Sequence, residues 1–170
     1  MVPGRWGSLA AAWLSAGLAA GGVRPVPLAG SAAPDFSLRT VEGETIRLSG
    51  LRGRAIVLDF WAPWCAPCRA EAPSLVALDA KYRSRGLVVI GAVADDSPRP
   101  AVEKFAHELG VRYAIGPGAA LAKSYGGADL LPQTFFIGRD GRIVSVATGL
   151  EGRDALERRS REILGEKPDG

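Results

Sequence analysis

Two cysteines, Cys65 and Cys68, are the residues of this sequence best suited to covalent chemistry. They are the only cysteines among 170 residues, and they stand three positions apart behind Trp64. Two cysteines are too few for a disulfide framework, and a bridge across two intervening residues would constrain the unfolded chain little. The spacing therefore favours a reactive dithiol that alternates between its thiol and disulfide states.

The residues on either side of the pair predict a strand followed by a helix. Ala55–Trp61 is a short, mostly apolar run of strand type, and the residues after Cys65 place apolar side chains at helical spacing. The N-terminus of a helix carries unpaired N–H groups and a partial positive charge, which stabilise a thiolate. Cys65 lies nearest those groups, so we expect it to have the lower pKa and to attack first. Cys68, one turn further in, is expected to resolve the mixed disulfide, and Pro67 is tolerated because the first turn does not need its N–H.

The alternative interpretation of the pair is half of a metal site. A closed zinc site needs about four ligands, whereas the sequence adds only one histidine, His107, to the two cysteines. Because this ligand set is incomplete, the sequence predicts no metal site and no cofactor.

The rest of the chain predicts strands that alternate with helices. The Asp95-Asp96-Ser97 run can cap the second long helix, and Asp140-Gly141 is a strong hairpin signal. This order is typical of an α/β protein with a mostly parallel sheet and an antiparallel hairpin at one side. The expected elements are a β-hairpin over 36–48, strands over 55–61, 87–93, 134–137 and 143–147, and helices over 65–86, 98–109, 119–125 and 153–164.

The N-terminal residues predict export. Arg5 precedes an uncharged run over 6–23 that is rich in alanine and leucine, and the first acidic residue is Asp35. This layout is typical of a signal peptide or of an uncleaved membrane anchor, and the sequence leaves both open. We therefore expect a location in the periplasm or on the outer face of the cytoplasmic membrane. The predicted organisation is a signal peptide or anchor over 1–24, a Pro-rich linker over 25–34, one domain over 35–165 and a flexible tail over 166–170.

The charge of the chain argues against a nucleic-acid partner. The net charge is +3, and without Arg5 and Arg24 the remaining chain has 19 basic and 18 acidic residues. No basic stripe with interleaved aromatic residues is present in the sequence, so binding to nucleic acid is not expected.

The motif over 60–68, Phe-Trp-Ala-Pro-Trp-Cys-Ala-Pro-Cys, resembles the active site of the thioredoxin fold. Three further features are similar to the TlpA/ResA-like family of exported thiol–disulfide oxidoreductases: the Ala-Pro-Asp-Phe run at 33–36, Pro73 five residues after Cys68, and an additional strand and helix over 87–110. The resemblance covers about Ala33 to Leu164. It implies a thioredoxin-like three-layer α/β fold with an N-terminal β-hairpin and an inserted strand–helix unit.

The resemblance also implies roles for single residues. Pro132 corresponds to the cis-proline that packs beside the cysteines in this family, where an X–Pro bond costs little in the cis form. Glu71 corresponds to the active-site glutamate of the ResA-like members, one turn beyond Cys68, although a solvated glutamate on the helix surface is the alternative. The residues expected to contact the substrate are Trp64, Ala66, Pro67 and Leu131.

Asp59 is a departure from the family, which often has asparagine at this position. A carboxylate inside an apolar strand should have a raised pKa and can relay protons for Cys68. Because both Asp59 and Glu71 are present, the sequence leaves open which of them accepts the proton. The stretch from Tyr125 to Pro132 also departs, since it is one residue longer than usual.

The activity implied by the resemblance is reduction of protein disulfides. The Ala66-Pro67 dipeptide contains no histidine that would further stabilise the Cys65 thiolate, which favours a reductant over a strong oxidant. The implied substrates are an apocytochrome c cysteine pair or a copper-site assembly protein, and the implied electron donor is a membrane reductant of the DsbD/CcdA type. Two other activities stay open: a Cu(I) metallochaperone that uses both thiolates, and a peroxiredoxin-like peroxidase, because the Ala-Pro-Asp-Phe run also opens peroxiredoxin chains.

Overall fold

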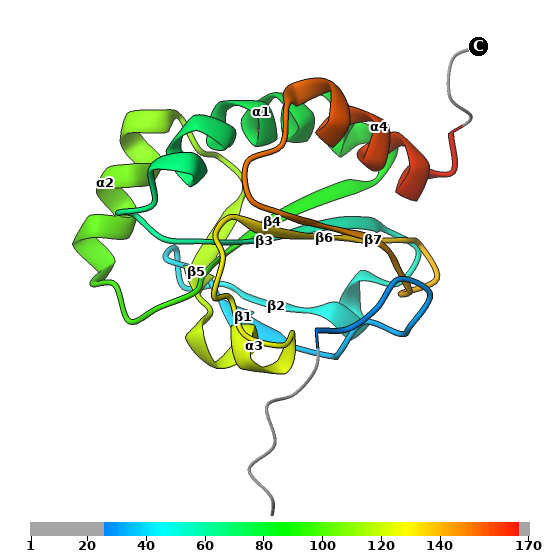
Figure 1. Ribbon diagram of the computed structural model, residues 1–170, viewed down its shortest axis with the longest axis horizontal. Coiled ribbons are helices and arrows are strands. Elements are labelled where there is room, and N and C mark those ends of the chain that lie inside the picture. Colours follow the sequence, from blue (N-terminus) through cyan, green and yellow to red (C-terminus); the bar gives the residue numbers. More distant parts are fainter. Residues whose placement is uncertain (1–25, 167–170) are drawn as a thin grey trace, which may run out of the picture.

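A five-stranded mixed sheet lies at the centre of the molecule (Figure 1). The computed structural model describes residues 26–166. The strand order is β5-β4-β3-β6-β7; β3, β4 and β5 are parallel, β6 runs antiparallel to β3, and β7 runs antiparallel to β6. The five strands are β3 (Ala55–Trp61), β4 (Leu87–Val93), β5 (Ala114–Pro117), β6 (Gln133–Ile137) and β7 (Ile143–Thr148).

Strand β3 occupies the middle of the sheet because all seven of its residues can be buried on both faces. It pairs with β4 on one side and with β6 on the other, and each of its side chains is buried. A strand with neighbours on both sides and layers on both faces is expected to be apolar throughout, and Asp59 is the one exception in β3. Because β3 and β4 are parallel, the loops that follow Trp61 and Val93 meet at one edge of the sheet.

Helices and a hairpin cover the two faces of the sheet and complete three layers (Figure 1). One face packs against three helices around a core that includes Trp61, Leu75, Phe105 and Leu156. The other face packs against a short helix and the hairpin, around Phe60 and Tyr125. The first group is α1 (Ala66–Tyr82), α2 (Arg99–Leu109) and α4 (Arg153–Leu164); the second is α3 (Ala119–Ser124), β1 (Ser37–Arg39) and β2 (Thr45–Arg47), with the 3-10 turns η1 (Leu48–Leu51) and η2 (Arg83–Arg85) at connections.

The three-layer fold expected from the sequence is confirmed, including the N-terminal hairpin and the inserted β4–α2 unit. Two local details differ. Strand β5 was not predicted, because its Ala-Ile-Gly-Pro sequence is too short to show alternation and contains two strand-breaking residues. The predicted side-chain cap of α2 is wrong: the helix begins after Pro98 without a side-chain cap, and Asp95 binds other groups.

The residues just before the hairpin lie along the edge of β7. The backbone N–H of Gly30 donates to the Ile143 carbonyl, the Ile143 N–H donates to the Ser31 carbonyl, and Ala32 forms a bridge with Arg142. Part of the predicted linker over 25–34 is therefore hydrogen-bonded to the domain. The predicted signal peptide or anchor over 1–24 lies outside the described residues. Within residues 26–166, no helix is long and apolar enough to cross a bilayer.

Candidate active site

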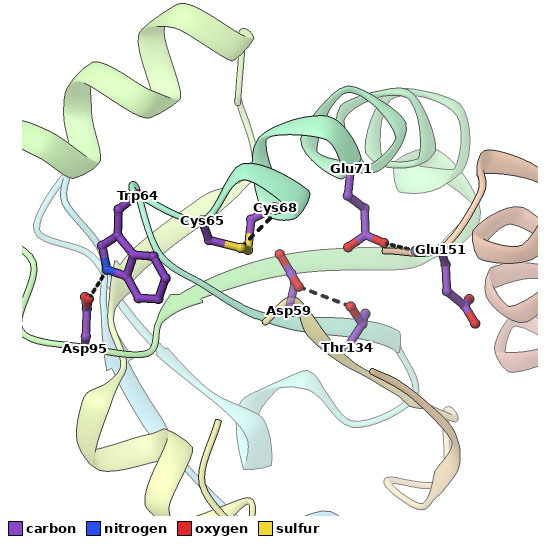
Figure 2. Close-up of a disulfide and its surroundings, with 8 residues drawn as sticks. All are labelled: Asp59, Trp64, Cys65, Cys68, Glu71, Asp95, Thr134 and Glu151. Carbon is purple, nitrogen blue, oxygen red and sulfur yellow. Dashed lines mark hydrogen bonds between the residues drawn. A yellow bond between two sulfur atoms is a disulfide. The ribbon is translucent and has the colours of Figure 1, made fainter. Parts of the chain in front are cut away.

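Cys65 and Cys68 form a disulfide at the N-terminus of α1 (Figure 2). Cys65 is the N-cap residue, its Cα lies 5.3 Å from that of Cys68, and its sulfur accepts a hydrogen bond from the Cys68 N–H at 3.2 Å. The same N–H would stabilise a Cys65 thiolate after reduction, since it points at the sulfur from the positive end of the helix. The local geometry thus favours Cys65 as the attacking thiolate.

A groove of about 280 Å³ is lined by Cys65 but not by Cys68. Its walls come from the loop after β3, the first turn of α1, the loop after β4 and the loop between α3 and β6. Both cysteines are nearly buried, at 4% and 3% exposure, so a substrate sulfur reaches the pair through this groove. The residues that line it are Trp64, Cys65, Ala66, Pro67, Ala94, Asp95, Ala128, Asp129, Leu130 and Leu131. The four predicted substrate contacts, Trp64, Ala66, Pro67 and Leu131, are therefore brought together.

The peptide bond between Leu131 and Pro132 is cis, as expected from the sequence. Pro132 is buried immediately before β6, and its carbonyl accepts a hydrogen bond from the Gly149 N–H at 2.7 Å. This bond ties the groove loop to the loop between β7 and α4. Leu131 lies at the groove edge, so its backbone is placed beside the cysteine that a substrate approaches.

Two buried carboxylates, Asp59 and Glu71, lie beneath the first turns of α1. Figure 2 shows Asp59 pointing from β3 toward the disulfide, with Glu71 descending from α1 beside it. Asp59 Oδ1 accepts a hydrogen bond from Thr134 Oγ1 at 3.1 Å, and Glu71 Oε1 accepts one from the Glu151 N–H at 3.0 Å. Glu71 Oε2 is buried without a hydrogen-bond partner. Glu71 is only 2% exposed, so the alternative of a solvated surface glutamate is wrong.

Burial keeps both carboxyl groups neutral at pH values where carboxyl groups in water are ionised. It raises the pKa of Asp59 from 3.8 to about 8, with a further increase from the charge of Glu71 and a smaller opposing effect of the Thr134 hydrogen bond. Burial likewise raises the pKa of Glu71 from 4.5 to about 7; the Glu151 N–H opposes this, and the Glu151 charge adds to it. Because ionised Glu71 disfavours ionisation of Asp59, the two carboxyl groups lose their protons in coupled steps. The pair can store and release a proton near neutral pH.

The coupling between the two carboxyl groups predicts that Glu71→Gln lowers the pKa of Asp59. Glutamine keeps an oxygen for the Glu151 N–H but carries no charge, so the repulsion that disfavours ionised Asp59 is lost. The measurement is a carboxyl-carbon NMR titration of the oxidised protein, in which Asp59 should ionise at lower pH than in the wild type. Glu151 and Tyr113 are the other ionisable groups close to the pair, and burial raises the pKa of Tyr113, so the tyrosine stays neutral throughout.

Glu42→Gln is the matched control for this titration. Glu42 is exposed in the turn between β1 and β2, and its loss should leave the Asp59 titration unchanged. An unaltered Asp59 pKa in Glu71→Gln would show that the two carboxyl groups are not coupled.

Known proteins are similar to this chain in sequence and in architecture. The family model described as Redoxin matches residues 28–161. The thiol–disulfide oxidoreductase ResA of Bacillus thuringiensis (strain Al Hakam) is 35% identical over 130 residues, which cover 75% of this chain and 74% of that protein. The chain belongs to the ResA-like thiol–disulfide oxidoreductases of the Redoxin family. ResA of Geobacillus kaustophilus is also 35% identical, over 136 residues that cover 79% of this chain and 77% of the relative.

The fold comparison agrees with this membership of the ResA-like family. A crystal structure of a protein from Chlorobium tepidum, described as thiol:disulfide interchange protein DsbE, superposes with a TM-score of 0.74 at 30% identity. The superposition covers 82% of this chain and 99% of that chain. The TlpA/ResA resemblance is therefore confirmed, and the protein is a thiol–disulfide oxidoreductase. Among residues 26–166 of this ResA-like enzyme, no group of three or more metal-binding side chains is present.

The structure adds three site residues that were not identified from the sequence of this ResA-like enzyme. Asp95 accepts a hydrogen bond from Trp64, Thr134 binds Asp59, and Glu151 binds Glu71 through its backbone. The position of Asp95 could have been predicted from the sequence, since it follows a strand parallel to β3 and so lies at the same sheet edge as the cysteines. The positions of Thr134 and Glu151 could not, because they depend on strand register and on the path of a loop.

Proposed function

We propose that this enzyme is an extracytoplasmic reductant of protein disulfides. The observation that carries the proposal is the asymmetry of the cysteine pair: Cys65 caps the helix and opens onto a groove, while Cys68 is buried above two carboxyl groups. One sulfur is placed to attack a substrate, and the other is placed to release it. The ResA relatives support the same chemistry.

The proposed reaction begins with the reduced enzyme. The Cys65 thiolate attacks one sulfur of a substrate disulfide, the substrate S–S bond breaks, and the other substrate sulfur leaves as a thiolate that takes a proton from water. A mixed disulfide now joins Cys65 to the substrate. Pro132 and Leu131 are proposed to hold the substrate backbone in the groove during this step, and Trp64, Ala66 and Pro67 to contact its side chains.

Release of the product requires deprotonation of Cys68. We assign its proton to the ionised form of Asp59, because Asp59 points toward the disulfide, whereas the Glu71 carboxyl group is turned toward the Glu151 N–H (Figure 2). The population of this ionised form rises as the pH approaches the Asp59 pKa of about 8. The Cys68 thiolate then attacks the Cys65 sulfur, which forms the Cys65–Cys68 disulfide and breaks the mixed disulfide. The substrate has gained two electrons and the enzyme has lost two, and Glu71 tunes the proton affinity of Asp59.

The proposed setting is the periplasm or the outer face of the cytoplasmic membrane. The uncharged run over 6–23 supports export or anchoring, and a membrane reductant of the DsbD/CcdA type would return the enzyme to the dithiol state. The proposed substrates are an apocytochrome c cysteine pair, as in cytochrome c maturation, or a copper-site assembly protein. These assignments rest on the family resemblance.

The reduction potential tests the direction of electron flow. We expect equilibration with glutathione to give a potential nearer that of thioredoxin, about −270 mV, than that of DsbA, about −120 mV, because no histidine stabilises the Cys65 thiolate. A value near the DsbA potential would make the protein an oxidant and overturn the proposed direction.

Trapping identifies the substrates. Cys68→Ser protein produced in its host should accumulate mixed disulfides on Cys65, since the resolving sulfur is absent, and mass spectrometry of the reducible adducts gives the partners. The Cys65→Ser, Cys68→Ser double variant is the control and should hold no adducts. Stoichiometric Cu(I) binding or rapid peroxide turnover without any disulfide adducts would favour the other two activities.

A further inference from the structure

Exposed apolar side chains gather around the active site. Among the described residues, five large hydrophobic side chains are exposed, and three of them come from loops at the cysteine end of the sheet: Trp64, Leu130 and Leu150, with 70%, 68% and 56% of their surface exposed. Trp64 and Leu130 line the groove above Cys65. Leu150 follows Gly149, which donates its N–H to Pro132. Exposed apolar surface concentrated in this way marks a contact site for another molecule.

Trp64 is held in place although most of its surface is in solvent. Its Nε1 donates a hydrogen bond to Asp95 Oδ2 at 2.6 Å (Figure 2). The other oxygen of Asp95, Oδ1, accepts a hydrogen bond from the Ser97 N–H at 2.9 Å. The indole therefore forms a fixed wall of the groove and links the loop after β3 to the loop after β4. A partner that packs on a fixed side chain does not have to order it on binding.

The groove beside this wall carries negative charge. Asp95 and Asp129 line it, and no lysine, arginine or histidine does. Burial acts to raise the pKa of Asp95, but hydrogen bonds from Ser97 and Trp64 outweigh it and lower the pKa below its ordinary value. On the opposite side of Trp64 the nearest cations, Arg69 and Lys104, both pair with Glu108. A substrate segment in the groove thus meets apolar walls and two carboxylates.

We propose that this groove selects disulfides from protein segments that place an apolar side chain and a lysine or arginine next to the reacting cysteine. The apolar side chain packs between Trp64 and Leu130, and the cation faces Asp95 and Asp129. This inference rests on the proposed function, because it assumes that the groove receives protein disulfides. Complementary charge at a partly exposed surface acts mainly on association and on the choice of partner.

Three peptides test the charge selection. Each contains the same Cys-x-x-Cys disulfide and one flanking leucine, and they differ in one neighbouring residue, which is lysine, glutamine or glutamate. For the reduced enzyme we expect kcat/KM to fall in that order, with about a 10-fold difference between lysine and glutamate at low salt. The difference should shrink as ionic strength rises.

Variants of Asp129 test whether the groove causes the preference for a positively charged neighbour. Asp129 is exposed in the groove wall, so Asp129→Asn should reduce the lysine-to-glutamate ratio and Asp129→Lys should reverse the order. Asp154→Asn, in the exposed first turn of α4, is the control with the same loss of charge and should keep the wild-type ratio. Replacing the flanking leucine by serine should slow the wild type more than it slows Trp64→Ala.

Equal rates for the three peptides, or a ratio that neither Asp129 variant changes, would overturn the inference. An uncharged small disulfide, hydroxyethyl disulfide, separates this outcome from failure of the proposed function. If the enzyme reduces it while the peptides show no charge preference, the dithiol chemistry stands and only the selectivity is wrong. If neither the peptides nor the small disulfide is reduced, the proposed function itself fails.

Discussion

Cys65→Ser is expected to lose disulfide reductase activity by about four orders of magnitude or more, since a serine hydroxyl is not ionised at neutral pH and forms no mixed disulfide. Cys65 is the sulfur that lines the groove and the one that the Cys68 N–H contacts, so no other group in the described site can replace it. The measurement is the rate of insulin reduction coupled to dithiothreitol, compared with the uncatalysed rate.

Loss of the disulfide itself is not expected to unfold the variant. A bridge across two intervening residues closes a very short loop, which the chain-entropy relation values at about 2 kcal/mol. The circular dichroism spectrum of Cys65→Ser should therefore match that of reduced wild-type protein. Cys68→Ser is the matched comparison, because it removes the same disulfide but keeps the attacking sulfur, and it should form mixed disulfides that Cys65→Ser does not form. Full activity in Cys65→Ser would rule out the proposed mechanism.

Asp59→Asn is expected to stabilise the protein while slowing product release. Asp59 is 3% exposed within a fully buried strand, and burial raises its pKa to about 8 from an ordinary 3.8. Between these two pH values the folded state keeps a proton that the unfolded state has lost, so stability falls as the pH rises. Asparagine takes no part in this titration, and its amide oxygen can still accept the Thr134 hydroxyl proton.

The size of the stabilisation follows from the pKa difference. Because Asp59 stays protonated in the folded state, its contribution lowers the free energy of unfolding by roughly 4 kcal/mol at pH 7 relative to low pH. Relaxation around the new amide reduces the net gain, so we expect Asp59→Asn to raise the free energy of unfolding by about 2 to 4 kcal/mol at pH 7. At pH 3 both states of the wild type are protonated at this position, and the gain should disappear. Urea unfolding of the oxidised proteins at pH 3, 7 and 9 measures it, with Glu42→Gln as the exposed control.

The same substitution should slow the second half of the reaction. If Asp59 accepts the Cys68 proton, its loss should slow resolution of the mixed disulfide by about 10²-fold near neutral pH. The rate should recover as rising pH ionises the Cys68 thiol without help. Rapid-quench analysis of the mixed disulfide separates this step from the first attack, which should be unchanged. If Asp59→Asn changed the free energy of unfolding by the same amount at pH 3 and at pH 7, Asp59 would not be protonated in the folded protein at pH 7.

Much of this protein is determined by local sequence. The apolar run of β3, the helical spacing in α1 and the Asp-Gly turn before β7 each specify an element through contacts between near neighbours, and the Cys65–Cys68 spacing places both sulfurs on one helical turn. These features were sufficient to predict the order of strands and helices, the α/β class and the dithiol, whereas the thioredoxin-like three-layer fold was implied by the family resemblance. The cis bond before Pro132 was expected from the family resemblance alone.

The tertiary structure determines which side chains and backbone groups surround the two sulfur atoms. Strand register places Thr134 opposite Asp59, the parallel ends of β3 and β4 bring Asp95 to Trp64, and the path of the loop after β7 delivers the Glu151 N–H to Glu71. Each of these pairs joins residues 31 to 80 positions apart. The pKa of a carboxyl group and the charge of a groove depend on every group nearby in space, whereas a sequence pattern reports only neighbours along the chain. The two cysteines were therefore evident from the sequence, but their proton acceptor and the groove that leads to them emerged only from the folded chain.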